Sequence, residues 1–120
     1  LIPMVDRILF GQSECSVICQ NIGGIANATL LKPDGHLLAM DTGPGNMVLD
    51  GIAKVYFDDE CDRNGKYSAR GEVNQGLLNM MMSCPALSRP FPRNFGREDF
   101  GQAYIDTHLL PYSRLHKVKG

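Results

Sequence analysis

The chain has 120 residues, which is enough for one domain with a modest hydrophobic core. Hydrophobic residues make up 43% and charged residues 21%, which argues against a disordered chain. The net charge of −1 gives no bias toward nucleic acid or anionic membranes, and no segment has the roughly 20 apolar residues that span a bilayer, so we expect neither partner.

The first part of the chain predicts a small sheet. Residues 15–20, CSVICQ, form an apolar run with Val and Ile that is typical of a buried strand. Residues 26–32 and 36–42 predict two more strands, because Pro33-Asp34-Gly35 between them suits a hairpin turn. Together they predict an antiparallel three-strand meander with Gly23-Gly24 at its first corner.

Helical spacing begins after the third strand. Apolar residues recur there at intervals of three and four, which indicates an amphipathic helix, and Asn46 is a suitable N-cap. The apolar positions are Met47, Val48, Ile52, Val55 and Tyr56. Residues 58–71 are polar and contain glycines, so we expect a loop. The meander followed by helices predicts an α/β fold.

The last third of the chain predicts two more helices around an irregular segment. Residues 73–83 suit a helix that ends before Cys84-Pro85, because the residue before proline disfavours helix. Residues 85–96 contain three prolines and predict an extended or irregular segment. Residues 97–110 predict a helix with one apolar side, formed by Phe100, Tyr104, Ile105 and Leu109.

The cysteines give no sign of a metal site. They show neither a CxxC pair nor a Cys/His cluster with zinc-ligand spacing, and we expect reduced thiols. The four are Cys15, Cys19, Cys61 and Cys84. The first residues also lack the basic and apolar regions of a signal peptide. We therefore expect a cytoplasmic location.

The first glycine stretch, Asn21-Ile22-Gly23-Gly24, has two interpretations. Glycine permits a positive φ and lets another group approach the main chain, and consecutive N–H groups at such a turn can hold phosphate. The alternative is a tight corner between two strands. The stretch is not a P-loop, because no Gly-Lys-Ser/Thr follows it.

The second stretch is Asp41-Thr42-Gly43-Pro44-Gly45-Asn46. A carboxylate at the end of a strand, a glycine-rich bend and a helix start would bring together an acid, free N–H groups and a helix dipole. Such a carboxylate could bind a sugar hydroxyl or, through water, a magnesium ion. Alternatively, Asp41 satisfies local backbone donors.

A third charged group, Arg97-Glu98-Asp99, opens the last predicted helix. Carboxylates in a first helical turn are expected from the helix dipole alone, although Arg97 could bind a carboxylate or phosphate through two hydrogen bonds. The histidines, at 36, 108 and 116, are isolated from any Ser or Cys motif. We therefore expect no nucleophilic catalysis.

The stretches NIGGIANATLL, DTGPGNMVLD, SARGEV and PALSRPFPRNFGREDF, in this order and spacing, closely resemble the anhydro-N-acetylmuramic acid kinase family. The resemblance places the chain in the sugar kinase, Hsc70 and actin superfamily, whose two lobes have ribonuclease-H-like cores. It implies use of ATP and Mg²⁺ to phosphorylate O6 of 1,6-anhydro-N-acetylmuramic acid while water opens the anhydro ring. The product, N-acetylmuramic acid 6-phosphate, belongs to peptidoglycan recycling.

The resemblance also implies roles for individual residues. Those expected near the phosphates of ATP are Asn21, Gly23, Gly24, Asn27, Gly43 and Gly45. Those expected near the sugar or magnesium are Asp41, Thr42, Asn46, Arg97 and Glu98. The family's general-base aspartate and its GTSxDG phosphate loop would lie upstream of this chain, so no catalytic residue and no direct metal ligand is assigned.

By the same resemblance, the chain is expected to be a partial second lobe. Residues 1–13 would connect from the first lobe, residues 14–57 would form the meander and helix, and residues 58–120 the loop and helical segment. Within the match, PRNFGRE replaces a more usual PKSTGRE. The chain could be part of an active kinase whose full-length form is a homodimer, a non-catalytic nucleotide-binding remnant, or part of a kinase for another sugar.

Overall fold

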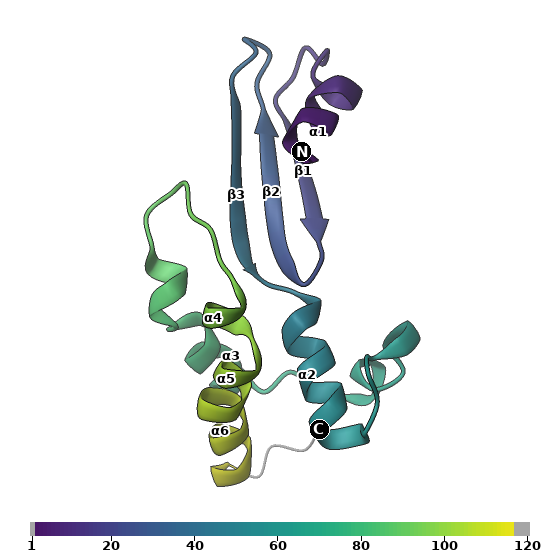
Figure 1. The fold of residues 1–120 in the computed structure, drawn as a ribbon, viewed down its shortest axis with the longest axis vertical. Helices are drawn as coiled ribbons and strands as arrows, with labels where there is room; N and C mark the ends of the chain where they lie inside the picture. Colours follow the sequence, from purple (N-terminus) through teal and green to yellow (C-terminus); the bar gives the residue numbers. More distant parts are fainter. Residues whose placement is uncertain (1, 117–120) are drawn as a thin grey trace.

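A three-stranded antiparallel sheet forms one end of the molecule in the computed structural model, which describes residues 2–116 (Figure 1). The strands β1 (Val17–Ile22), β2 (Ile25–Leu31) and β3 (Leu37–Pro44) lie in the order β1-β2-β3. The predicted meander is therefore confirmed. Gly35, in the turn between β2 and β3, has a φ of 83°, a conformation that favours glycine.

The first strand begins and ends two residues later than predicted. The predicted strand covered residues 15–20, but β1 pairs with β2 from Val17↔Leu31 to Ile22↔Ala26. Pairing continues this far because Gly23-Gly24 turns the chain within two residues. Cys15 therefore lies outside the sheet, and all four cysteines are free thiols, as predicted.

A β-bulge interrupts the pairing of β2 with β3. Ala26 pairs with Gly43 and Asn27 pairs with Asp41, so Thr42 is the extra residue on β3. A bulge bends its strand and changes the direction of nearby side chains. This bulge lies where the predicted site residues of β3 begin.

Helices form the other end of the molecule (Figure 1). They are α2 (Asn46–Phe57), α3 (Gln75–Met82), α4 (Arg97–Phe100), α5 (Gln102–Tyr104), a π-helical stretch (Ile105–Leu109) and α6 (Leu110–Leu115). The predicted loop at 58–71 contains two short 3₁₀ turns, Arg63–Gly65 and Ser68–Arg70. The helices predicted after Gly45 and within residues 73–83 are confirmed.

The structure differs from the helical prediction in four details. The proposed connection at residues 1–13 contains the helix α1 (Ile2–Phe10), which the sequence did not predict. Gly45 is the N-cap of α2, and Asn46 is its first residue. Pro85–Ser88 forms a 3₁₀ turn within the segment predicted to be irregular. The helix predicted over 97–110 is broken because Gly101 adopts an extended conformation, with ψ at −160°.

The main core lies between α2 and the C-terminal helices. Phe100 and Ile105 are each 1% exposed, and Val48 of α2 belongs to the same cluster. The aromatic rings of Phe95, Phe100 and Tyr104 meet edge to face, an arrangement that stabilises aromatic clusters. The predicted apolar side of residues 97–110 is therefore confirmed as buried.

The molecule is elongated, with extents of 50 × 31 × 23 Å. Its radius of gyration is 16.8 Å, whereas a compact domain of this length has about 14 Å. Helix α1 buries none of its residues, and Ile8 is 75% exposed. No helix within residues 2–116 has the length and apolar character needed to cross a bilayer.

Candidate functional site

The two glycine-rich stretches predicted to form a site are hydrogen-bonded to each other. The N–H of Asn46 donates to the Gly23 carbonyl at 2.8 Å. The N–H groups of Gly45 and Met47 both donate to the Gly24 carbonyl at 3.1 Å. The first turn of α2 thus lies against the β1–β2 turn (Figure 1). The N–H groups at the start of α2 are therefore not free, contrary to the expectation for the stretch 41–46.

Gly45 is explained by this close contact. A Cβ atom at Gly45 would overlap the Gly23 carbonyl oxygen and would lie 3.2 Å from the Gly24 carbonyl oxygen. At this position the fold therefore requires space that only glycine leaves. Gly45 therefore serves the junction between the sheet and α2.

Lack of space for a side chain does not explain the glycines at positions 23 and 24. Neither has a positive φ, contrary to one reason given for them above. The nearest atoms to an added Cβ would be 3.7 Å away at Gly23 and 3.6 Å away at Gly24, which are ordinary contacts. Within residues 2–116 neither N–H has a hydrogen-bond acceptor. Two adjacent donors are therefore available to a bound group.

An open groove of about 760 Å³ adjoins this turn. It brings together three of the predicted site residues, Gly24, Asn46 and Arg97. The other residues that line it are Met47, Asp50, Gly51, Lys54, Glu60, Gly101 and Gln102. The groove wall carries two cations, Lys54 and Arg97, and two carboxylates, Asp50 and Glu60, and the N–H of Gly24 lies beside them without an acceptor. Glu98 does not line the groove, and its carboxylate folds back toward Gly96.

Asp41 and Asn27 lie in a different hollow, of about 440 Å³. Asn94, from the segment before α4, lines the same hollow. One carboxylate oxygen of Asp41 accepts a hydrogen bond from the Phe95 N–H at 2.7 Å. Asp41 therefore satisfies a backbone donor 54 residues away rather than the local donors that the alternative interpretation expected. Its second oxygen has no partner within the described residues. This hollow has one carboxylate and two amide groups on its wall.

Thr42 and Gly43 line a third, largely apolar hollow of about 310 Å³ beside Met81 and Met82. The Thr42 hydroxyl instead interacts with the sheet, since it accepts a weak hydrogen bond of 3.4 Å from the Gln20 side chain. Seven of the predicted site residues are thus divided among three hollows, and the other four line none of them: Asn21, Gly23, Gly45 and Glu98.

Gln20 is a residue that the sequence did not single out. Its amide also donates to the main-chain carbonyl of Asn27 at 2.8 Å and to that of Asn21 at 3.2 Å. Asn21 itself is exposed on β1. Gln20 therefore joins β1, β2 and the bulge of β3. No sequence motif indicated this role, because it depends on the register of three strands.

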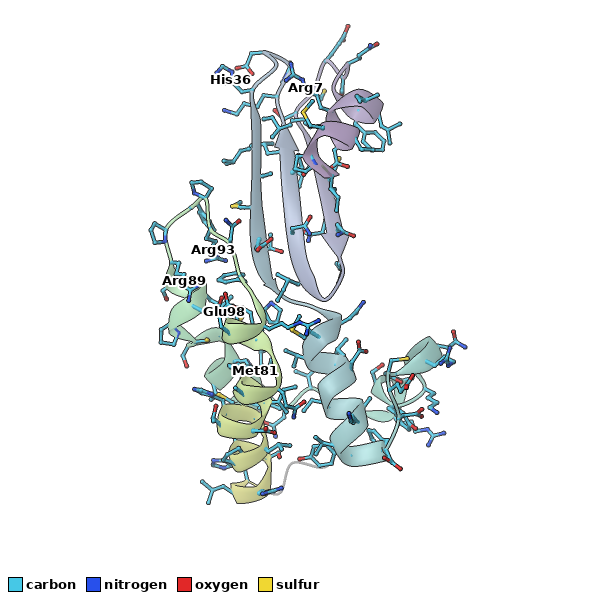
Figure 2. The ribbon with its side chains drawn as sticks, in the orientation of Figure 1. Arg7, His36, Met81, Arg89, Arg93 and Glu98 are labelled. Atoms are coloured by element: carbon cyan, nitrogen blue, oxygen red, sulfur yellow. The ribbon has the colours of Figure 1, made fainter. Side chains whose placement is uncertain are left out.

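Arg93 is the second residue that the sequence did not single out. Figure 2 shows it on the segment that runs alongside β3, close to Arg89. Its guanidinium donates to the Thr42 carbonyl at 3.0 Å, and its own carbonyl accepts the N–H of Asp41 at 2.9 Å. The replacement of the lysine of PKSTGRE by Arg93 marked this position as unusual. The sequence did not show that Arg93 contacts Asp41 and Thr42 of β3.

Arg89 and Asp99 form an ion pair that orders the same segment. The Asp99 side chain is 6% exposed and also accepts the Gly96 N–H at 3.1 Å. The hydrogen bond from Arg89, and to a lesser extent that from Gly96, lowers the pKa of Asp99 below its ordinary value. Asp99 thus fixes the start of α4, next to Arg97.

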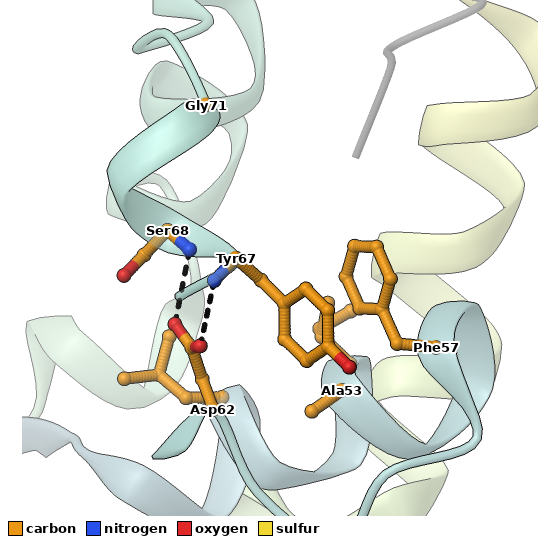
Figure 3. Close-up of a pocket in the computed structure, with 8 residues that line it drawn as sticks. Ala53, Phe57, Asp62, Tyr67, Ser68 and Gly71 are labelled. Atoms are coloured by element: carbon orange, nitrogen blue, oxygen red, sulfur yellow. Dashed lines mark hydrogen bonds between the residues drawn. The ribbon is translucent and has the colours of Figure 1, made fainter. Parts of the chain in front are cut away.

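A separate apolar pocket of about 140 Å³ lies under α2, away from these hollows. Figure 3 shows Phe57 and Tyr67 at this pocket, with their rings stacked at 3.8 Å between centroids. Asp62 accepts the N–H groups of Tyr67 at 2.8 Å and Ser68 at 3.0 Å. None of the predicted site residues lines this pocket.

The described residues contain no ready-made metal centre. Across residues 2–116, no group of three or more His, Cys, Asp or Glu side chains is placed to hold a metal ion. The single carboxylate in the Asp41 hollow could contribute at most one ligand.

Comparison with known proteins agrees with the resemblance seen in the sequence. A family model described as anhydro-N-acetylmuramic acid kinase matches residues 1–119. The anhydro-N-acetylmuramic acid kinase of Clostridioides difficile (strain 630) is 37% identical over 120 residues, which cover 98% of this chain and 31% of the relative. The protein of the same name from Sulfurovum sp. (strain NBC37-1) is 42% identical over 107 residues, which cover 89% of this chain and 29% of the relative.

A third relative of that name, from Vibrio cholerae serotype O1, is 34% identical over 113 residues, covering 94% of this chain and 30% of the relative. The chain thus spans about a third of the length of these curated relatives. Since the family model covers nearly every residue, the chain belongs to the anhydro-N-acetylmuramic acid kinase family.

Proposed function

We propose that this chain is part of an ATP-dependent kinase that phosphorylates O6 of 1,6-anhydro-N-acetylmuramic acid and opens its anhydro ring. The product would be N-acetylmuramic acid 6-phosphate, in peptidoglycan turnover in the cytoplasm. In this proposal residues 1–120 belong to the second lobe of an actin-like fold with a ribonuclease-H-like core. The order of three antiparallel strands and a helix is consistent with the start of such a lobe.

The observation that carries the proposal is the pair of free donors at Gly23 and Gly24. The fold itself requires neither glycine, since both have ordinary φ values and room for a Cβ atom. Consecutive backbone donors of this kind bind phosphate oxygens without a lysine.

The proposed place for ATP is beside the β1–β2 turn, where Arg97 and Lys54 are exposed cations that can pair with phosphate oxygens. Asp50 and Glu60 on the same wall offset their charge, so the backbone donors, rather than the net charge of the groove, support this placement. Magnesium is different, because the described residues supply no cluster of ligands for it. Mg²⁺ commonly binds through substrate phosphates with only one or two carboxylates, so we propose that it arrives with ATP.

The Asp41 hollow is the proposed sugar side of the site. A carboxylate oxygen without a partner and two side-chain amides suit the hydroxyl and acetamido groups of an amino sugar. Phosphoryl transfer depends mainly on the alignment of donor and acceptor and on electrostatic stabilisation. The proposed role of this chain is therefore to hold both substrates, and no general base is assigned to it.

A chimeric enzyme tests this function. Residues 1–120 would replace the matched segment of the Clostridioides difficile kinase, to which they are 37% identical. We expect ATP-dependent formation of N-acetylmuramic acid 6-phosphate, detected by mass spectrometry. A matched chimera carrying Gly24→Val should fold but lose most of this activity. A folded chimera that phosphorylates another amino sugar but not this one would contradict the proposed substrate.

A further inference from the structure

We propose that Arg93 is a positioning residue for the sugar side of the site, which it maintains by tying the segment before α4 to the bulge of β3. This inference rests on the proposed function for the identity of the ligand. The structural part, which concerns how Asp41 is held, can be tested without any enzyme activity.

The guanidinium of Arg93 lies among four main-chain carbonyl groups. Two of them belong to β3, where the Arg93 side chain donates to Thr42 at 3.0 Å and to Asp41 at 3.4 Å. The other two belong to its own segment, where it donates to Leu87 and, at 3.5 Å, to Arg89. The side chain therefore bridges two parts of the chain that are about fifty residues apart in sequence.

Aromatic rings hold the same group in place. The guanidinium carbon lies 4.6 Å from the centre of the Phe91 ring and 5.1 Å from that of the Phe95 ring. Cations at such distances are attracted to the ring faces. Within residues 2–116 Arg93 forms no ion pair with a carboxylate. Its contacts are therefore entirely with carbonyl groups and rings.

These contacts determine where the Asp41 carboxylate lies. The main chain at Arg93 accepts the Asp41 N–H at 2.9 Å, and two residues later the Phe95 N–H donates to the Asp41 carboxylate at 2.7 Å. Asn94, between them, lines the same hollow as Asp41. If the segment moved away from β3, the carboxylate would lose its donor and the hollow would lose one wall.

A lysine, which the more usual PKSTGRE has at this position, could not form all of the Arg93 contacts seen here. Arginine has five N–H donors in a rigid plane, whereas lysine has three donors on one nitrogen atom. An ammonium group could keep the attraction to the rings but could not reach carbonyl groups on both sides. Arg93→Lys therefore separates the bridging role from the charge, and Arg93→Met removes both.

Amide hydrogen exchange on the 120-residue chain tests the structural part. In Arg93→Lys and Arg93→Met, we expect the N–H groups of Asp41 and Phe95 to exchange about tenfold faster or more. Thr29, in the central strand, should keep its rate. Arg70→Met removes an exposed cation from a remote 3₁₀ turn and should change none of these rates. Unchanged exchange at Asp41 and Phe95, or equal acceleration at Thr29, would overturn the proposal.

Kinetics of the chimeric kinase test the functional part. Arg93→Lys should raise KM for the anhydro sugar about tenfold. KM for ATP should increase by a smaller factor. Equal increases in both KM values, or an unchanged KM for the sugar, would overturn the positioning role. If the chimera with Arg93 intact were folded but inactive, the proposed function would fail, while the exchange result would still decide how Asp41 is held.

Discussion

The Asn46 N–H donates to the Gly23 carbonyl oxygen at 2.8 Å, and this bond joins the first turn of α2 to the turn between β1 and β2. The Met47 N–H donates to the Gly24 carbonyl in the same way. The helix donors are therefore used inside the protein, while the N–H groups of Gly23 and Gly24 have no acceptor within residues 2–116. This arrangement assigns the external donors to the β1–β2 turn rather than to the helix.

Replacing Gly45 by valine should destabilise the junction. The new Cβ would overlap the Gly23 carbonyl, and overpacking of this kind costs about 1–3 kcal/mol. Urea unfolding would measure the free-energy change. Gly24→Ala is the control, because its Cβ would meet only the end of the flexible Met47 side chain, at 3.6 Å. Equal destabilisation by both substitutions would contradict this account of Gly45.

The ion pair between Arg89 and Asp99 predicts a pH dependence of stability. Because the folded protein lowers the pKa of Asp99, its stabilising contribution is complete above the unfolded value and is lost as pH falls below it. That unfolded value is about 3.9. The wild-type protein should be more stable than Asp99→Asn at pH 7, and the difference should narrow below about pH 4.

Thermal unfolding at several pH values would measure this narrowing. Arg89→Met gives a second test, since it removes the cation and should reduce the pH dependence in the same range. The difference in stability between wild type and Asp99→Asn could instead stay constant from neutral to acid pH. That result would show that the ion pair does not stabilise the fold.

Local signals predicted the meander and the helix after Gly45 well. Alternating and helical spacings of apolar residues depend on near neighbours in the chain, and so does the turn at Pro33-Asp34-Gly35. The break of the last helix was missed, although Gly101, a residue of low helix propensity, lies at the break and adopts an extended conformation. The helix α1 was missed because a resemblance suggested a connection there.

The candidate site was predictable only in part. Gly23, Gly24 and Arg97 could be named from their residue types, but which N–H groups remain free could not. That result depends on the contact between Gly45 and Gly23, which are 22 residues apart. The bridge from Arg93 to Thr42 likewise spans 51 positions. Such contacts follow from tertiary packing, which no local pattern in the sequence encodes.

The N-cap of α3 predicts a measurable loss of stability. The Asn74 side chain accepts the Leu77 N–H at 2.9 Å, and replacement of such a cap by alanine costs about 1 kcal/mol. Chemical unfolding of Asn74→Ala should show this loss, whereas Asn74→Asp should retain most of the stability because its carboxylate can accept the same bond. Equal loss in both variants would exclude capping as the cause.

The apolar face of α1 predicts self-association. Ile8 is 75% exposed and Leu9 66% exposed, so replacing both by glutamate should cost the fold little, about 0.5 kcal/mol each at most. Light scattering should then show less association at the same concentration. A loss of stability as large as that of a core substitution would show that this face is packed in solution.

The N–H groups of Gly23 and Gly24, which have no acceptor within residues 2–116, are the centre of the account. A titration of the ¹⁵N-labelled chain with ATP·Mg²⁺ tests them most directly. The account predicts saturable shifts of both glycine amide signals and of signals from Arg97, with weaker binding in Gly24→Val. Millimolar ATP·Mg²⁺ that leaves these signals in place, or that shifts only signals remote from the β1–β2 turn, would contradict it.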